Sequence, residues 1–201
     1  MSAGSLHVLA VVGSLNKNAV TRVVINHVAG LMRKEGVSVD VLDFLKEPLA
    51  LFNPDSFDSV EGFDELRMRV DRADAYVLGT PDYHGSISST MKNFLDHFWH
   101  EFAGKLFATV VASHEKGLTV TDQLRTVARQ CYAWTLPYGI SFMEDADVKE
   151  GRIASDSLRQ RLEILVRDVR IYGGLIAQQR RADLAGTEAS FLARYRKRTQ
   201  E

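Results

Sequence analysis

Short apolar runs alternate with amphipathic segments along most of the chain. Five runs predict strands buried on both faces, over residues 6–12, 37–43, 74–80, 105–113 and 135–142. The segments between them repeat apolar residues three and four positions apart, which is the spacing of one helix face. Near-continuous apolar strands joined by helices predict a mostly parallel sheet that is covered on both sides.

This alternation predicts an α/β fold of the doubly wound kind, with a five-stranded parallel sheet in the order 2-1-3-4-5 and helices on both faces. Ligands of such sheets bind beyond the carboxyl ends of the strands, where the strand order reverses. We expect one domain over residues 1–180 and a C-terminal extension over residues 181–201. Residues 47–62, which hold two prolines, are expected to form a surface excursion.

Composition narrows the class of protein. The 201 residues are 45% hydrophobic and 25% charged, as in a folded globular chain, and the net charge of -1 gives no field that would draw the protein onto nucleic acid or an anionic membrane. Cys131 is the only cysteine, which excludes an intramolecular disulfide and fits a reducing compartment. No apolar run approaches the roughly 20 residues that span a bilayer, so we expect a cytoplasmic protein.

The loop after the first predicted strand, "GSLNKNAVTRVV", runs directly into a helix. Backbone N–H groups at a helix start lack internal partners and lie at the positive end of the helix dipole, so a phosphate can bind there. Ser14 or Asn18 could instead cap the helix. The loop matches neither GxGxxG nor GxxxxGK[ST], which argues against a dinucleotide fingerprint and a P-loop.

The loop after the third predicted strand opens the stretch "GTPDYHGSISSTMKNFLDHF". Pro81 fixes the chain as it leaves the strand, Gly85 permits a backbone conformation closed to other residues, and Ser86 can cap the following helix. A flat ring could lie against that backbone. His97 and His100 follow beside Asp96, but their spacing is poor for a metal site and we expect none.

The motifs "PDYHGS" and "KNFLDHF", with "GS" after the first strand, resemble the flavodoxin-like NAD(P)H-dependent FMN reductases, a family that includes quinone, chromate and azo-dye reductases. The likeness covers about residues 6–177. It implies FMN as cofactor, NADPH or NADH as electron donor, and ping-pong transfer of electrons to a quinone, a flavin or a similar small acceptor. It also implies a homodimer or homotetramer.

The resemblance also implies which residues contact the cofactor, while the redox chemistry belongs to the flavin and no catalytic side chain is implied. Around the phosphate it places Ser14, Asn16, Asn18, Ala19, Val20 and Thr21. Along the ring and the ribityl chain it places Pro81, Asp82, Tyr83, His84, Gly85 and Ser86. In the loop after the fourth strand, at the pyrimidine edge, it places Ser113, His114 and Gly117.

The sequence departs from the family pattern at three places, and the first two predict weaker binding of the cofactor phosphate. Asn16 stands where many members have arginine, Ala19 stands where serine is common, and "SHEKG" replaces a glycine-rich loop. Two alternatives therefore stay open. One is a flavodoxin-type electron carrier that does not turn over nicotinamide, although carriers of that kind tend to be strongly acidic. The other is a domain that binds a phosphorylated ligand and has lost flavin.

Overall fold

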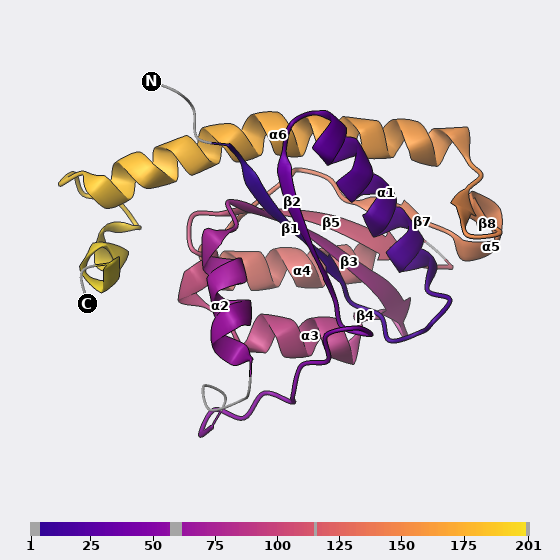
Figure 1. Cartoon of the computed structure of the whole chain (residues 1–201), viewed down its shortest axis with the longest axis horizontal. Helices are drawn as coiled ribbons and strands as arrows, with labels where there is room; N and C mark the ends of the chain where they lie inside the picture. Colours follow the sequence, from indigo (N-terminus) through magenta and orange to yellow (C-terminus); the bar gives the residue numbers. More distant parts are fainter. Residues whose placement is uncertain (1–4, 57–61, 115, 200–201) are drawn as a thin grey trace.

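The fold is a parallel sheet between two layers of helices (Figure 1). The computed structural model describes residues 5–56, 62–114 and 116–199. Residues 57–61, which are part of the predicted excursion, and Glu115, in the loop after the fourth predicted strand, lie outside the described residues. Within the described ranges, no helix is both long and apolar enough to cross a membrane.

The sheet has the predicted doubly wound order, β2-β1-β3-β5, with the fifth position shared by β6 and β7. The strands of this ladder are parallel and comprise β1 (His7–Val12), β2 (Ser38–Asp43), β3 (Ala75–Tyr83), β5 (Leu106–Ala112), β6 (Trp134–Thr135) and β7 (Ile140–Phe142). The short β4 (Ser86–Ile87) pairs antiparallel with β3, and β8 (Val148–Lys149) forms a hairpin with β9 (Arg152–Ile153).

Helices cover both faces of the sheet, as the apolar patterns predict. They are α1 (Val20–Lys34), α2 (Phe63–Arg72), α3 (Ser89–Asp96), α4 (Leu118–Gln130), α5 (Glu144–Asp147) and α6 (Asp156–Ala185), with short 3-10 helices η2 (His100–Phe102) and η3 (Ala193–Thr199). Side chains alternate along each strand: Val8 and Ala10 pack in the cluster of α1 and α6, whereas Leu9 and Val11 pack with α2, α3 and α4.

Strand register brings the loops that follow β1, β3 and β5, called here the first, second and third loops, to one edge of the sheet. Val12 pairs with both Asp43 and Gly79, so β1, β2 and β3 reach this edge together. Pro81 pairs with Ala112, which places the end of β5 beside the end of β3. The carboxyl ends of these strands therefore surround a common space, as the doubly wound topology requires.

The fifth predicted strand is wrong as a single element. Residues 136–139 interrupt it, and the run pairs with β5 in two short strands, β6 and β7. Pro137 has no N–H to donate to the ladder, which breaks the regular pairing. At Gly139 the chain lies so close to β5 that an added Cβ would be 2.4 Å from Thr109 Oγ1.

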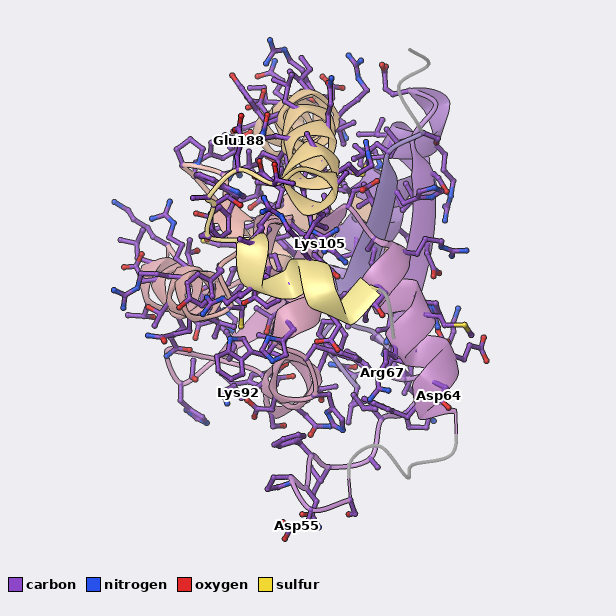
Figure 2. All side chains as sticks on the ribbon, turned by 90° about the vertical axis from the view of Figure 1, so that its left-hand side faces the viewer. Asp55, Asp64, Arg67, Lys92, Lys105 and Glu188 are labelled. Atoms are coloured by element: carbon purple, nitrogen blue, oxygen red, sulfur yellow. The ribbon has the colours of Figure 1, made fainter. Side chains whose placement is uncertain are left out.

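The chain beyond α6 folds back over the amino ends of the strands. Leu192 is 2% exposed, and a Cβ added to Gly104 would lie 2.8 Å from its Cδ1 atom. Arg196 Nε donates to the carbonyl of Asp183 at 2.7 Å. Figure 2 looks onto this end, where η3 lies in front of the sheet. The tail is thus anchored by one buried side chain and by a hydrogen bond to α6.

Gly79→Ala is expected to destabilise the protein because β3 lies close against α1. An added Cβ would be 2.4 Å from Ile25 Cγ1 and 2.7 Å from Ile25 Cδ1. Overpacking of this kind costs about 1–3 kcal/mol in the free energy of unfolding, measured by urea denaturation. The matched control is Gly174→Ala, within α6, where nothing lies within 4 Å of the new methyl group. The control should be neutral or stabilising by up to about 1 kcal/mol; equal losses in both variants would refute this packing explanation.

Candidate functional site

The loop between β1 and α1 is fixed by close backbone contact and by one arginine. Gly13 N donates to Gly79 O at 2.7 Å, and a Cβ at Gly13 would lie 2.9 Å from that oxygen. Arg22 donates from Nε and Nη2 to the two carboxylate oxygens of Asp43, at 2.6 and 3.2 Å. Glycine permits the approach of the two strands here, and the arginine joins the end of β2 to the start of α1.

The same guanidinium group binds the carbonyl oxygens of the loop. Arg22 donates to the main-chain oxygens of Asn16 at 2.8 Å, Lys17 at 3.1 Å and Ser14 at 3.2 Å. These oxygens therefore face Arg22, and that of Asn16 also accepts from Ala19 N at 3.1 Å. Arg22 belongs to the stretch quoted in the sequence analysis, but its partner Asp43 is 21 residues away.

No side chain caps α1. Ala19 occupies the N-cap position without a side-chain hydrogen bond, and Asn16 Oδ1 accepts instead from Asn18 N at 2.9 Å. The interpretation of Ser14 or Asn18 as helix cap is therefore wrong. Arg22 N donates to Ala19 O at 3.1 Å, so the N–H groups of Val20 and Thr21 are the ones available for an anion, at the positive end of a 15-residue helix.

The second loop is a β-hairpin turn. β3 continues three residues beyond the predicted end, and Tyr83 pairs with Ser86 across a two-residue turn. His84 and Gly85 have φ of 57° and 75°, as a type I′ turn requires at both central positions. Asp82 Oδ1 accepts from Gly85 N at 2.8 Å, which holds the turn closed.

Two side chains support this hairpin from outside it. Gln123 on α4 accepts at Oε1 from Ser86 Oγ at 3.1 Å and from Ile87 N at 3.0 Å. Ser88, and not the predicted Ser86, caps α3 by accepting from Met91 N at 3.1 Å. Ser88 Oγ also donates to Gly13 O at 2.6 Å, which links the hairpin to the first loop. Ser86 cannot cap because it forms β4.

The third loop is joined to the second through Asp82. Ser113 Oγ donates to Asp82 Oδ2 at 2.8 Å, and Ser113 N donates to Phe142 O at 2.9 Å. Gly117 is the N-cap residue of α4, with φ of 59°, and a Cβ there would lie 3.0 Å from Val111 Cγ1. His114 is exposed between them. The three predicted loops therefore form one connected structure.

A cavity of about 120 Å³ lies where these loops meet. Its lining comprises Ser14, Asn16, Ala19, Thr21, Pro81, Asp82, Tyr83, Ala112, Ser113, His114 and Glu144. The other predicted residues, which are Asn18, Val20, His84, Gly85, Ser86 and Gly117, lie beside it along the chain but do not line it. Sequence reasoning missed Ala112, at the end of β5, and Glu144, although the place of Glu144 two residues after the last parallel strand was available as an indication.

The cavity offers hydrogen-bond donors without a cation. Ser14 and Thr21 are buried hydroxyl-bearing residues in its wall, and the Arg22 charge is paired with Asp43 behind the loop. No described lysine or arginine lines the cavity. Its volume of about 120 Å³ suits one end of a cofactor-sized ligand, since whole ligand sites usually measure roughly 300–1,000 Å³. Donor groups at a helix start fit a phosphate.

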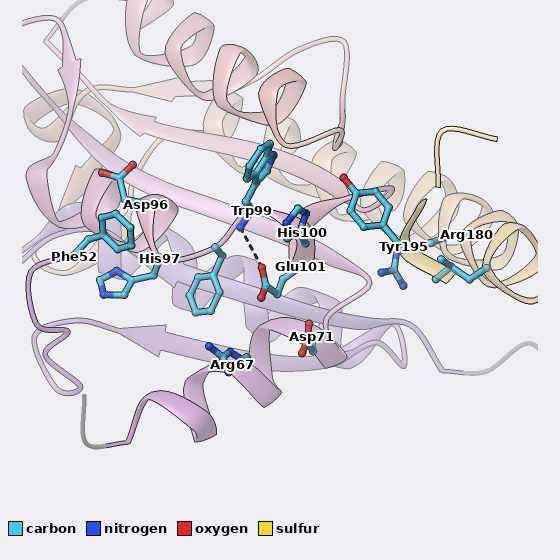
Figure 3. Close-up of a pocket in the computed structure, with 12 residues that line it drawn as sticks. Phe52, Arg67, Asp71, Asp96, His97, Trp99, His100, Glu101, Arg180 and Tyr195 are labelled. Carbon is cyan, nitrogen blue, oxygen red and sulfur yellow. Dashed lines mark hydrogen bonds between the residues drawn. The ribbon is translucent and has the colours of Figure 1, made fainter. Parts of the chain in front are cut away.

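A larger cavity, of about 890 Å³, lies at the opposite end of the sheet (Figure 3). None of the predicted cofactor residues lines it, but Asp96, His97 and His100 do. His97 is buried, with Nδ1 2.8 Å from Asn93 O, and its ring packs against Phe52. Among the described residues, no three histidine, cysteine or acidic side chains group closely enough to hold a metal ion.

The cofactor chemistry suggested by this geometry agrees with comparisons to known proteins. A family model described as NADPH-dependent FMN reductase matches residues 6–147. The chain belongs to this family. Membership confirms the resemblance, and with it an NAD(P)H-dependent FMN oxidoreductase with FMN as cofactor.

Individual relatives agree in sequence and in fold. An FMN-dependent NADPH-azoreductase of Staphylococcus haemolyticus is 27% identical over 141 residues, covering 66% of this chain and 74% of that protein. An apo NADH:FMN oxidoreductase, EmoB, superposes with a TM-score of 0.68 over 84% of this chain and 90% of its own, at 16% identity. FerB, an NAD(P)H:acceptor oxidoreductase of Paracoccus denitrificans, gives 0.66 over 87% and 98%, at 18% identity.

Arg22→Lys is expected to weaken FMN binding about tenfold, because lysine cannot reproduce the forked contacts to Asp43 and to the loop carbonyls. Riboflavin, which lacks the phosphate, should bind the variant and the parent chain equally. Quenching of flavin fluorescence measures both affinities. Arg33→Lys, on the exposed side of the same helix, is the control and should change neither. Parallel losses for FMN and riboflavin would show that the clamp does not act on the phosphate loop.

Proposed function

We propose that the cavity and its rim bind FMN, with the phosphate at the start of α1 and the ring against the β3–β4 turn. The observation that carries this proposal is that one cavity is lined both by the uncapped start of α1, at Ala19 and Thr21, and by Asp82 and Tyr83, which lead directly into the type I′ turn on its rim. Ser14 and Thr21 would donate hydroxyl groups to the phosphate beside the first-turn N–H groups. The missing cation is consistent with the modest affinity that Asn16 and Ala19 predict.

The turn at His84 and Gly85 gives the ring a flat backbone surface. Gly85 has no side chain, and the contacts of Asp82 and Gln123 fix the turn before any ligand arrives. Such preorganisation lowers the entropy cost of binding. We assign His84 a backbone role, since its side chain does not line the cavity. Ser113, His114 and Gly117 would face the pyrimidine edge, where the Ser113 hydrogen bond to Asp82 holds the third loop in place.

We infer a ping-pong reaction in which the nicotinamide and the electron acceptor occupy the same place in turn. Bound FMN would supply the redox chemistry, accepting a hydride from NAD(P)H and passing electrons to a quinone, a flavin or a similar small acceptor. The chain's residues position the partners and exclude water. Exposed apolar side chains are available for this around the loops, namely Leu15, Tyr83, Leu118 and Met143.

We also infer that the protein works as a homodimer or homotetramer in the cytoplasm. The exposed apolar side chains around the loops support self-association, because a neighbouring subunit would cover them and shield the ring from water. The single buried Cys131 fits a reducing compartment. Mass measurement by light scattering at working concentration tests the assembly.

Gly85→Val should abolish FMN binding, because a β-branched residue is strained at φ of 75° and places its side chain on the surface proposed for the ring. Gly151→Val is the matched control: it introduces a similar strain at φ of 69° in the β8–β9 hairpin, with nothing within 4 Å. Both variants should lose a similar amount of stability on thermal unfolding, and only the first should lose FMN. Unchanged FMN affinity in Gly85→Val would exclude the proposed ring position.

Steady-state kinetics test the order of reaction separately. With FMN-loaded protein, double-reciprocal plots at several concentrations of a quinone should give parallel lines for NAD(P)H oxidation, as a shared site and sequential departure require. Intersecting lines would show that donor and acceptor bind together. A protein that holds FMN but oxidises no NAD(P)H would instead be an electron carrier.

A further inference from the structure

An aromatic and basic cavity lies at the amino ends of the strands, away from the proposed cofactor site. It measures about 260 Å³ and is lined by Arg125, Arg129, Tyr132, Ala133, Trp134, Thr135 and Phe191. Trp134 pairs with Leu106 at the start of β5, whereas the cofactor loops follow the end of that strand at Ala112. Six strand steps separate the two ends by about 20 Å, so the two sites do not overlap.

The aromatic rings of this cavity are exposed although they contact one another. Trp134 is 52% exposed, Phe191 42% and Tyr132 40%. The Phe191 ring lies 6.3 Å from that of Trp134 and 6.4 Å from that of Tyr132, measured between centroids. The neighbouring Leu192, which is 2% exposed, anchors the tail, so Phe191 is not needed for this purpose. The rings therefore form a surface on which a flat molecule can stack.

Tyr132 adopts a strained backbone conformation. It follows the last turn of α4 with φ of 57°, and Ala133 N donates back to Ala128 O at 2.8 Å, as in a Schellman motif. Glycine is the usual residue at this position, because a side chain there is strained by about 1–2 kcal/mol. An aromatic residue retained at a glycine position is the kind of outlier that accompanies binding sites.

The charge of the cavity is positive and partly unpaired. Arg129 is exposed, and no described residue forms an ion pair with it. Among the described residues the acidic partner of Arg125 is Asp122, at 3.4 Å, and Arg125 Nη2 also donates to Pro137 O at 2.7 Å. The guanidinium of Arg194 lies 3.9 Å from the centre of the Tyr132 ring. Of the described residues that line the cavity, none is a carboxylate. Neighbouring arginines without acids select an anion.

We propose that this cavity binds a planar aromatic anion, with its ring stacked against Trp134 and Tyr132 and its anionic group on Arg129 and Arg125. Aryl sulfonates, aryl phosphates and nucleotides share this chemistry. A second copy of the chain is disfavoured as occupant, because a symmetric contact through this surface would bring arginines against arginines. The adjoining cavity of Figure 3 carries both acids and arginines and gives no such selection.

The chain provides its own reporter for this proposal. It contains two tryptophans, Trp99 and Trp134, so a proton–nitrogen correlation NMR spectrum has two indole signals. Trp134→Phe assigns them by removing one. Trp99 Nε1 already donates to Gln130 O at 3.1 Å and lies outside the cavity lining, which makes it an internal control. The experiment uses the full chain saturated with FMN, so that binding of a probe at the cofactor site does not contribute to the signal.

Four probes separate the features of the ligand. Naphthalene disulfonate and adenosine monophosphate carry both a ring and an anion, naphthylmethanol carries only the ring, and sulfate carries only the anion. We expect a saturable shift of the Trp134 signal with at least one of the first two probes. The probe that binds more tightly shows whether the site prefers an aryl sulfonate or a nucleotide. The last two should bind at least about tenfold more weakly.

Arg129→Gln should weaken binding of the preferred probe about tenfold. Phe191→Ala should also weaken it, and Arg152→Gln, at an exposed arginine of β9, should not. No saturable shift of Trp134, equal affinity in Arg129→Gln, or equally tight binding of naphthylmethanol would each overturn the proposal. A failure here leaves FMN binding at the other end of the sheet untouched.

Discussion

The guanidinium group of Arg22 holds the first loop and the second strand in a single arrangement. It joins a buried carboxylate, Asp43, to three loop carbonyl oxygens, and the carboxylate would be costly to leave buried without a partner. Since the guanidinium takes up the carbonyl oxygens of the loop, the N–H groups at the start of α1 are the polar groups left for a ligand. An anion site thus results from an arginine that does not touch the anion.

Asp82 joins the second and third loops in a similar way. One carboxylate oxygen closes the hairpin turn at Gly85 and the other accepts from Ser113, so that the turn and the third loop cannot move independently. With Ser88 bridging to Gly13, all three loops form one hydrogen-bonded unit. This unit stands on parallel strands whose carboxyl ends share one edge, which is why residues about a hundred positions apart line the same cavity.

The strand order and the family followed from local patterns in the sequence, because apolar periodicity and the "PDYHGS" motif each lie within a short stretch. Features that depend on distant partners could not be predicted this way: Gln123 supports Ile87 across 36 residues, and Arg22 reaches Asp43 across 21. Ser86 was expected to cap α3, but strand pairing assigns Ser86 to β4, and Ser88 is the cap. The break in the fifth strand was accessible, since Pro137 lies within the run. Glu144 could have been predicted from the rule that ligand sites lie beyond the carboxyl ends of parallel strands.

The central claim is that the cavity at the start of α1 is the phosphate end of the FMN site, and a crystal structure of the full chain grown with FMN tests it most directly. We expect the phosphate beside Ser14 and Thr21, with the ring against the His84–Gly85 turn and Arg22 still bound to Asp43. Cofactor bound at another place, or a cavity filled by side chains in crystals that contain FMN, would contradict the claim.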